Sequence, residues 1–215
     1  MRDGKRHRAP SLKPQAPKPQ GVAISPTRII LASRSPRRSE LLRAAGILFE
    51  VVFAEVDEAP RVGESPEDYV ERLALEKAQA VATLEPDSYV LGADTSVVVD
   101  GRILGKPQDD AEAGAMLRSL QGRAHEVFTG VALIGPRATR SAVDRTTVWF
   151  ERMTDADIRW YVESGEPKDR AGAYAIQGLA SRFVSRIEGS YTNVVGLPIP
   201  MVMGLLRAEL PEFRH

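Results

Sequence analysis

The sequence lacks cysteine altogether and has little histidine, and both absences restrict its chemistry. Among 215 residues there is no Cys and there are three His. Without Cys the chain forms no disulfide, thiolate nucleophile, Cys-ligated zinc site or iron–sulfur cluster. His7 and His215 lie near the chain ends, so His125 is the single interior imidazole and a multi-His metal site is excluded. Catalysis would have to use carboxylates, hydroxyls, lysine or arginine.

Long apolar runs and a net charge are also missing. No segment approaches the ~18 consecutive apolar residues of a membrane span, so we expect no membrane partner and a cytoplasmic location. The 29 basic side chains equal the 29 acidic ones, which argues against a constitutive nucleic-acid binder. The length fits one domain, or a domain with two lobes and a tail.

The charge is unevenly distributed along the chain. Residues 1–20 hold six basic side chains, one acidic side chain, four prolines and few apolar residues. Such a composition cannot bury enough surface to offset the entropy of ordering, so we predict a disordered basic, proline-rich arm over residues 1–24. A solvated extension is favoured over an arm that contacts nucleic acid or a membrane. Residues 25–215 are expected to form a single domain.

Within that domain, strand and helix signals alternate, which predicts the α/β class. Short apolar runs indicate strands, and a Ser or Thr before a proline or an acidic residue indicates a helix start. Strands are expected at residues 29–32, 49–55, 89–93, 96–99, 127–134, 142–150 and 183–187. Asp100-Gly101 predicts a hairpin turn after the strand at 96–99. Helices are expected from Pro36 to Gly46, after Ser65, at 109–121, from Thr154 to Val162, and after Pro198 or Pro200.

Three arginines follow the first strand at the start of the first helix. Arg34, Arg37 and Arg38 surround the cap-and-proline pair of Ser35 and Pro36. Free N–H groups, the positive end of the helix dipole and guanidinium groups together suit an anionic, phosphate-bearing ligand. A solvated basic turn is the alternative, but cations at a helix N-terminus oppose the dipole. The anion site is therefore favoured.

Asp94 is expected to end a buried strand, where open α/β sheets place reactive groups. Its carboxylate would hold Mg²⁺ or take a proton from water, and a turn-capping Asp is the alternative. The nearby segment 101–107 resembles a P-loop but is one residue short, with Pro107 in place of the required Ser or Thr. Lys106 remains a candidate for phosphate contact, and His125 is expected to be a core or sheet-edge histidine.

Residues 169–178 are rich in Gly and Ala and include one amide, Gln177. An amide offers the paired donor and acceptor that read the edge of a nucleobase. A tight loop packed on the core is the alternative, and the residues alone do not decide between them.

Five separated segments together resemble one family. They are LASRSPRRSELL (Leu31 to Leu42), GADT (Gly92 to Thr95), GKP (Gly105 to Pro107), GAYAIQG (Gly172 to Gly178) and GSYxxVVGLP (Gly189 to Pro198). In this order they resemble the Maf family of nucleoside triphosphate pyrophosphatases, from about residue 28 to the C-terminal helix. The Arg after Ser-Pro and the Ile-Gln-Gly ending are similar to the dTTP/UTP branch rather than the 7-methyl-GTP branch.

The resemblance implies hydrolysis of a nucleoside triphosphate, dTTP or UTP, to the monophosphate and pyrophosphate. It also implies a divalent metal (Mg²⁺ or Mn²⁺), a homodimer, no nucleic-acid partner, and a two-lobed inosine-triphosphatase-like α/β fold with a long mixed central sheet and a cleft. By its motifs, Asp94 would be the proton acceptor. Nucleotide choice would depend on Arg37, Thr95 and Gln177. The phosphate and metal site would comprise Ser33, Arg38, Glu58, Lys77 and Lys106, with Glu58 and Asp94 as metal ligands.

Three positions depart from the family pattern. Ala175 replaces the usual Gly, Arg170 the usual Lys, and Asp57 the common Glu. Ala175 adds a methyl group beside the expected base-reading residue, which bears on base preference more than on the reaction. Two biological roles are consistent with the resemblance. One is removal of non-standard nucleotides with a link to cell-division arrest, and the alternative is a nucleotide-binding regulator of septum formation with little turnover.

Overall fold

A computed structural model describes residues 27–213, and the predicted arm of residues 1–24 lies outside them. The strands are β1 (Ile29–Ala32), β2 (Glu50–Val51), β3 (Tyr89–Val99), β4 (Arg102–Leu104), β5 (Ala124–Ile134), β6 (Thr139–Phe150) and β7 (Val184–Glu188). The α-helices are α1 (Pro36–Ala44), α2 (Pro66–Ala82), α3 (Asp110–Leu120), α4 (Asp155–Glu163), α5 (Tyr191–Val195) and α6 (Ile199–Glu209). Three 3₁₀ turns complete the set: η1 (Ala171–Ala173), η2 (Leu179–Phe183) and η3 (Pro211–Phe213).

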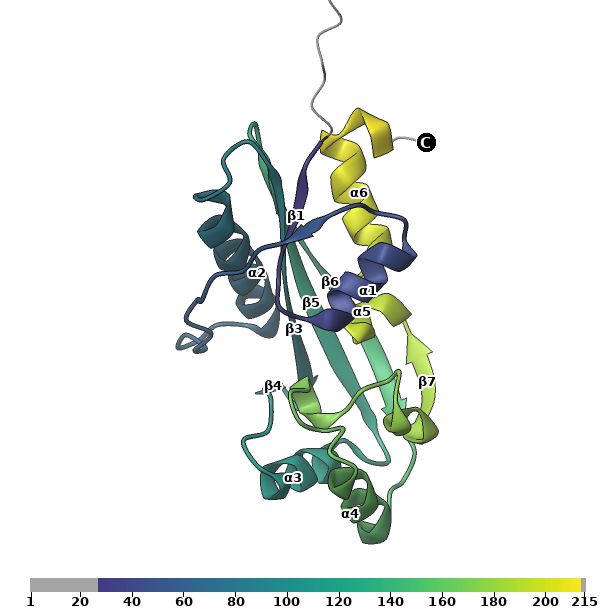
Figure 1. The fold of residues 1–215 in the computed structure, drawn as a ribbon. Helices are drawn as coiled ribbons and strands as arrows, with labels where there is room; N and C mark the ends of the chain where they lie inside the picture. The colour runs from purple at the N-terminus through teal and green to yellow at the C-terminus, as the bar shows by residue number, and fades with distance from the viewer. Residues whose placement is uncertain (1–26, 214–215) are drawn as a thin grey trace, which may run out of the picture.

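One mixed sheet runs the length of the molecule (Figure 1). Its strand order is β2-β1-β3-β5-β6-β7, and β4 also pairs with β3. β1 is parallel to β2 and β3, whereas β3, β5, β6 and β7 are joined by antiparallel pairing. The α/β class and the long mixed sheet flanked by helices are therefore confirmed. No helix among residues 27–213 is long and apolar enough to cross a membrane.

Helices cover the sheet in two separate groups, one toward each end (Figure 1). At one end, α2 packs on one face of the sheet, where its Ala74 and Ala78 share an apolar cluster with Val90 of β3. On the other face, Leu42 of α1 and Leu206 of α6 share a cluster with Leu91 of β3. At the other end, α3, α4, η1 and η2 enclose a separate apolar cluster. That cluster includes Val97, Leu117, Val127, Tyr161 and Phe183. The two groups of helices make two lobes on a shared sheet.

Local sequence signals fix several element ends as expected. Ser65 accepts a hydrogen bond from the Asp68 backbone N–H at 3.1 Å, and Thr154 with Asp157 forms a full capping box at the start of α4. Asp100 and Gly101 have φ of 50° and 72°, the values that a two-residue hairpin between β3 and β4 requires.

Two strand predictions are wrong. The strand expected over residues 49–55 is limited to Glu50–Val51, because its partner β1 ends at Ala32 and leaves the following residues nothing to pair with. The separate strands expected at 89–93 and 96–99 are one strand, β3, in which Asp94 pairs with Gly130 of β5. Helix α5 was not predicted. Asp94 is thus an interior residue of β3 and does not end it.

Candidate active site

The site begins at a gap along one edge of β3. On this edge β1 pairs with β3 as far as Gly92, and β4 pairs with it from Val97. The residues between them, including Asp94 and Thr95, face no strand on that side, because β5 occupies the opposite edge. Asp94 therefore lies just beyond the carboxyl end of the neighbouring strand β1. The sequence pattern predicts it at the carboxyl end of its own strand.

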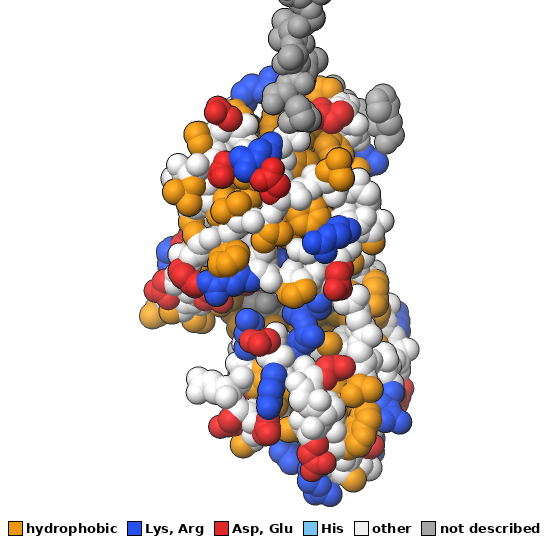
Figure 2. Space-filling view, in the orientation of Figure 1, with side chains coloured by type: hydrophobic (Ala, Val, Ile, Leu, Met, Phe, Trp, Pro, Cys, Tyr) orange, Lys and Arg blue, Asp and Glu red, His pale blue; other side chains and the backbone are white. Residues whose placement is uncertain are grey.

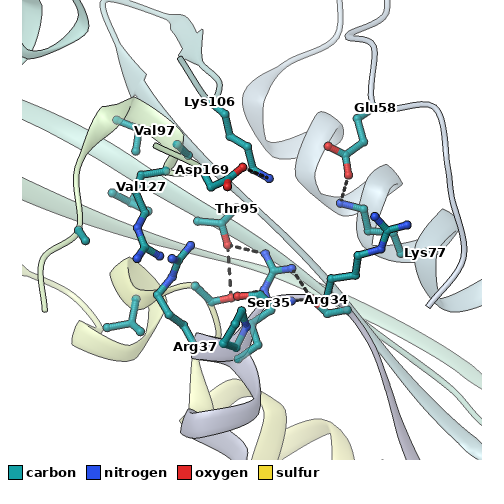
Figure 3. A pocket seen from close by; sticks show the side chains of 18 of the residues that line it. Arg34, Ser35, Arg37, Glu58, Lys77, Thr95, Val97, Lys106, Val127 and Asp169 are labelled. Carbon is teal, nitrogen blue, oxygen red and sulfur yellow. Dashed lines mark hydrogen bonds and ion pairs between the residues drawn. The ribbon is translucent and has the colours of Figure 1, made fainter. Parts of the chain in front are cut away.

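The loop from β1 to α1 crosses this gap and brings in the predicted arginines. Pro36 begins α1, but the Ser35 side chain makes no capping hydrogen bond. The Ser35 backbone N–H donates instead to Ser33 Oγ at 3.2 Å. Arg34 and Arg37 line the cleft (Figure 3). Arg34 also stacks over the Phe53 ring and pairs with Glu55. The N-terminal turn of α1, where the sequence predicts an anion site, therefore borders the cleft.

Arg38 is held from three directions. Its Nε donates to the Gly196 carbonyl at 2.8 Å, its Nη1 to Ser33 Oγ at 3.0 Å and its Nη2 to Thr95 Oγ1 at 3.1 Å. Burial lowers the pKa of Arg38, and the charges of Asp94 and Glu58 oppose that shift. The guanidinium stays protonated because arginine does not lose its proton in proteins. Arg38 is a fixed positive charge beside the two carboxylates.

The Thr95 hydroxyl contacts several of the groups that surround Arg38. Besides accepting from Arg38, its hydroxyl lies 2.9 Å from Thr129 Oγ1 and 3.3 Å from the Gly196 carbonyl. Thr95 lines the cleft, but these hydroxyl contacts are all with the protein. Its contacts place Arg38 and link β3 to the turn between α5 and α6.

Lys77 of α2 joins the two predicted carboxylates. Its Nζ donates to Asp94 Oδ1 at 2.7 Å and lies 2.6 Å from Glu58 Oε1. The Lys77 and Asp94 side chains are only 14 % and 11 % exposed, so solvent screens this pair weakly. In Figure 3, Lys77 and Glu58 point toward each other at the side of the cleft. The fold thus brings together three predicted site residues from β3, α2 and a loop.

The protonation of the two carboxyls differs with their surroundings. Burial raises the pKa of Asp94, and the charges of Lys77 and Arg38 only partly counteract it. Burial also acts to raise the pKa of Glu58, but the Lys77 hydrogen bond and the charges of Lys77, Lys106 and Arg38 outweigh it and lower that pKa. Asp94 is therefore the more basic of the two.

Two glycines bring α2 close enough for Lys77 to reach Asp94. A Cβ at Gly92 would lie 2.2 Å from the Ala74 carbonyl oxygen, and a Cβ at Gly130 would lie 2.2 Å from the Val70 carbonyl oxygen. Side chains at these positions would push the helix off the sheet. The close approach of helix and sheet is thus a condition for the Lys77–Asp94 contact.

The other lobe contributes loops to the far side of the cleft. Lys106 follows β4 and lies 3.7 Å from Asp169 Oδ1, and the Gly172 N–H donates to the Gly105 carbonyl at 3.0 Å. Gln177, exposed at the end of the next loop, also lines the cleft. In Figure 3, Arg37 and Lys106 extend into the cleft from opposite lobes. All predicted site residues except Asp94 line it directly, and Asp94 is a buried residue that contacts the lining residue Lys77.

Some cleft residues were missed by the sequence argument. Lys168 and Arg170 line the same wall as Gln177, and Arg170 Nε is buried without a hydrogen-bond partner among the described residues. Burial lowers the pKa of Arg170. The available signal was that both cations flank Asp169, just before the Gly/Ala segment. Phe53 was missed as well, since its segment was expected to be a strand.

The completed cleft is large and positively charged. It has a volume of about 910 Å³ and lies between the lobes, where Figure 2 shows a hollow bordered by Lys and Arg side chains. Seven basic side chains line it against three acidic ones. The basic residues are Arg34, Arg37, Arg38, Lys77, Lys106, Lys168 and Arg170. A cleft of this size and charge fits an anionic ligand of nucleotide dimensions.

The donor set also bears on metal binding. The described residues contain no cluster of three or more Asp, Glu or His side chains suited to a metal ion. Lys77 contacts one oxygen of Asp94 and one of Glu58. Mg²⁺ commonly binds through one or two carboxylates together with water and substrate phosphates, so this pair fits a metal that arrives with a phosphate ligand.

Comparison with known proteins gives a consistent set of relatives. The family model described as "Maf-like protein" matches residues 28–209. The chain is 53 % identical to a "dTTP/UTP pyrophosphatase" of Symbiobacterium thermophilum, covering 83 % of this chain and 92 % of the relative. It is 52 % identical to one of Myxococcus xanthus, covering 86 % and 94 %. Among solved structures, the Staphylococcus aureus Ham1 protein matches at 18 % identity with a TM-score of 0.47, covering 85 % of this chain and 100 % of that one.

Proposed function

The chain belongs to the Maf family, and on that basis we propose that it hydrolyses dTTP and UTP to the nucleoside monophosphate and pyrophosphate. The observation that carries the proposal is that relatives matching more than four-fifths of the chain at about half identity are dTTP/UTP pyrophosphatases by name. The cationic cleft supports it, because a triphosphate brings several negative charges that the seven basic side chains can neutralise.

Asp94 is the proton acceptor in the proposed reaction. Water attacks the α-phosphorus, Asp94 takes the water proton, and pyrophosphate leaves. Burial raises the pKa of Asp94 and so makes its carboxylate a stronger base than an exposed Asp. Lys77 keeps the carboxylate in place through its 2.7 Å hydrogen bond. A positioned general base typically contributes ~10²–10⁴-fold to the rate.

Phosphate binding falls to the cations on both sides of the cleft. Arg37 and Lys106 project from opposite lobes, so together they hold a triphosphate across the gap (Figure 3). Arg38, fixed by Ser33 and Thr95, supplies a preorganised charge near the Asp94 carboxylate. Such fixed charges lower the barrier because they need no reorganisation as charge develops on the leaving group.

Glu58 and Asp94 are the residues that would hold a divalent cation, Mg²⁺ or Mn²⁺, together with the substrate phosphates. When bound, the cation supplies charge neutralisation and Lewis-acid polarisation of a phosphoryl oxygen. Lys77 contacts both carboxylates and thereby keeps them close together before substrate arrives.

Nucleotide choice is assigned to the loop that carries Gln177, with Arg37 and Thr95. The Gln177 amide offers a donor and an acceptor to the base edge. Thr95 acts through Arg38, since its hydroxyl contacts are with protein groups. If Gln177→Ala leaves the relative kcat/KM values for UTP, CTP and GTP unchanged, Gln177 does not read the base.

Pyrophosphate release from a panel of nucleotides tests the function. The purified chain is incubated with dTTP, UTP, CTP, GTP and 7-methyl-GTP, with Mg²⁺, with Mn²⁺ or with excess chelator. Release from dTTP and UTP above the others, and its loss with chelator, is the expected result. Nucleotide binding without pyrophosphate release would contradict the proposal and favour a regulator of septum formation.

The resemblance further supports a homodimer in the cytoplasm, with nucleotides rather than nucleic acid as partners. Analytical ultracentrifugation of the full chain tests the oligomeric state, and a monomer at micromolar concentration would contradict it.

A further inference from the structure

The loop that carries Gln177 has little regular structure to fix its shape. Residues 174–178 connect η1 to η2, and their turn hydrogen bond runs from the Gly178 N–H to the Ala175 carbonyl at 3.0 Å. Gln177 itself is exposed in the cleft wall. A loop that discriminates between nucleobases has to hold its amide in one place, so its supports lie elsewhere.

Two side chains outside the cleft supply these supports. Glu166, which follows α4, accepts hydrogen bonds from the Leu179 N–H at Oε2 (2.9 Å) and from the Ala180 N–H at Oε1 (3.2 Å). Tyr161 of α4 accepts one from the Ala175 N–H at 3.2 Å. Gln177 lies two residues from Ala175 and two from Leu179, so the loop is fastened on both sides of it.

Glu166 and Tyr161 act as one unit. The Tyr161 hydroxyl donates to Glu166 Oε1 at 2.7 Å, and its ring is fully buried in the core of this lobe. Burial, together with the Glu166 hydrogen bond, raises the pKa of Tyr161, so the hydroxyl keeps its proton and can donate and accept at once. The unit is thereby tied to the rigid helix α4.

The fit of Gly178 is an independent sign of this attachment. A Cβ at Gly178 would lie 2.1 Å from Glu166 Oε2 and 2.5 Å from its carboxyl carbon. The Gly178 φ of −108° is accessible to any residue, so the glycine is required by the space that the carboxylate occupies. The carboxylate sits directly against the loop backbone.

From these contacts we propose that Glu166 and Tyr161 are positioning residues that set nucleobase selectivity by holding the Gln177 loop, although neither lines the cleft. This inference rests on the proposed nucleotide hydrolysis. Its distinguishing feature is that the phosphate-binding residues Arg37 and Arg38 belong to the other lobe, and that Lys106 of this lobe pairs with Asp169 and not with Glu166.

Glu166→Gln is the primary test. Both carboxylate oxygens of Glu166 accept a hydrogen bond from a loop N–H. In the variant one of these oxygens is replaced by an NH₂ group, which cannot accept, so at least one hydrogen bond to the loop is lost. We expect the ratio of kcat/KM for dTTP to that for GTP to fall about tenfold, through a higher KM for dTTP at nearly unchanged kcat. Gly178→Ala, which displaces the carboxylate from the loop side, should lower the same ratio.

Asp157→Asn is the matched control. It weakens the capping box at the other end of α4 and lowers stability without touching the loop. We expect this variant to keep the wild-type ratio. If Glu166→Gln and Asp157→Asn lower kcat/KM for both nucleotides equally, with the ratio unchanged, Glu166 is merely structural and the inference is overturned.

Amide hydrogen exchange separates this inference from the proposed function. In Glu166→Gln the amides of Ala175, Leu179 and Ala180 should exchange faster than in the wild type, while those of α2 do not change. Continued protection of these amides overturns the inference whether or not the enzyme is active. Failure of the wild-type chain to hydrolyse dTTP or UTP refutes the proposed function instead. In that case the exchange rates alone still test whether Glu166 holds the loop.

Discussion

Replacing Gly92 by alanine tests how the site is assembled. The added Cβ would lie 2.2 Å from the Ala74 carbonyl oxygen and 2.9 Å from Ala78 Cβ. Because ordinary carbon contacts begin near 3.4 Å, α2 must move outward by about 1 Å. The neighbouring Lys77 moves with the helix. A Lys77 Nζ–Asp94 Oδ1 distance of 2.7 Å would then become about 3.7 Å, beyond hydrogen-bond length.

Two effects of different size follow from this shift. Overpacking of a core typically costs about 1–3 kcal/mol of unfolding free energy, so the variant should fold but melt earlier. A misplacement of about 1 Å in a catalytic arrangement can cost 10²-fold in rate, equivalent to about 2.7 kcal/mol of activation free energy. We therefore expect Gly92→Ala to lose roughly 100-fold in kcat/KM for dTTP while it keeps its circular dichroism spectrum.

Gly204→Ala is the control for this experiment. Gly204 is exposed in α6, and a Cβ there meets nothing within 4 Å. This variant should gain about 0.5–1 kcal/mol from helix propensity and keep wild-type kcat/KM. Pyrophosphate release and thermal unfolding are measured for both variants. If Gly92→Ala retains activity within threefold of the wild type, the approach of α2 to the sheet does not position Lys77 and the reasoning is refuted.

Three further predictions follow from single side chains. Asp94→Asn should keep the fold and lose about 10²–10⁴-fold of kcat for dTTP in the pyrophosphate assay; unchanged turnover would exclude it as the base. Arg38→Lys should lower kcat/KM for dTTP and UTP about tenfold or more, because one ammonium cannot replace three directed donors, and equal activity would show that charge alone suffices. Burial lowers the pKa of His125 to about 4, so the folded protein keeps it neutral while the unfolded chain binds a proton near pH 6.5. Stability is therefore full above pH 6.5 and should fall by up to about 3 kcal/mol toward pH 4. In denaturant titrations across this range His125→Gln should lose less, and an equal loss would refute the argument.

Helix boundaries were predictable because their signals are local. The capping pairs at Ser65 and Thr154 satisfy backbone groups within three residues, and the Asp100-Gly101 turn depends on two backbone angles. The predicted length of the strand at 49–55 was wrong because that length depends on the partner strand β1, which is distant in sequence and ends at Ala32. Strand length depends on the partner available as much as on the apolar pattern.

The site residues likewise divide into those that local sequence patterns identify and those that depend on distant contacts. Arg38 and Asp94 lie in compact motifs, and Glu58 and Lys77 follow from the family resemblance, so all four could be named before their contacts were known. Their geometry could not, since the Lys77–Asp94 contact depends on glycines in two strands. Residues that act from irregular loops, such as Lys168 and Arg170, have no periodicity to reveal them. Glu166 lies outside the cleft, and its partners in the Gln177 loop are backbone amides, which no sequence pattern specifies.

The sheet that joins the two lobes has a mechanical consequence. β3 pairs with β5 from Val90 to Val98, and β5 pairs with β6 from Ala124 to Ile134, so three long strands pass through both lobes without interruption. A hinge between the lobes would have to break these ladders, whose hydrogen bonds are cooperative and mutually supporting. The lobes therefore move as one stiff frame. Closure around a ligand by a change in the angle between the lobes is not expected, and the overall dimensions of the molecule in solution should stay nearly constant through a turnover.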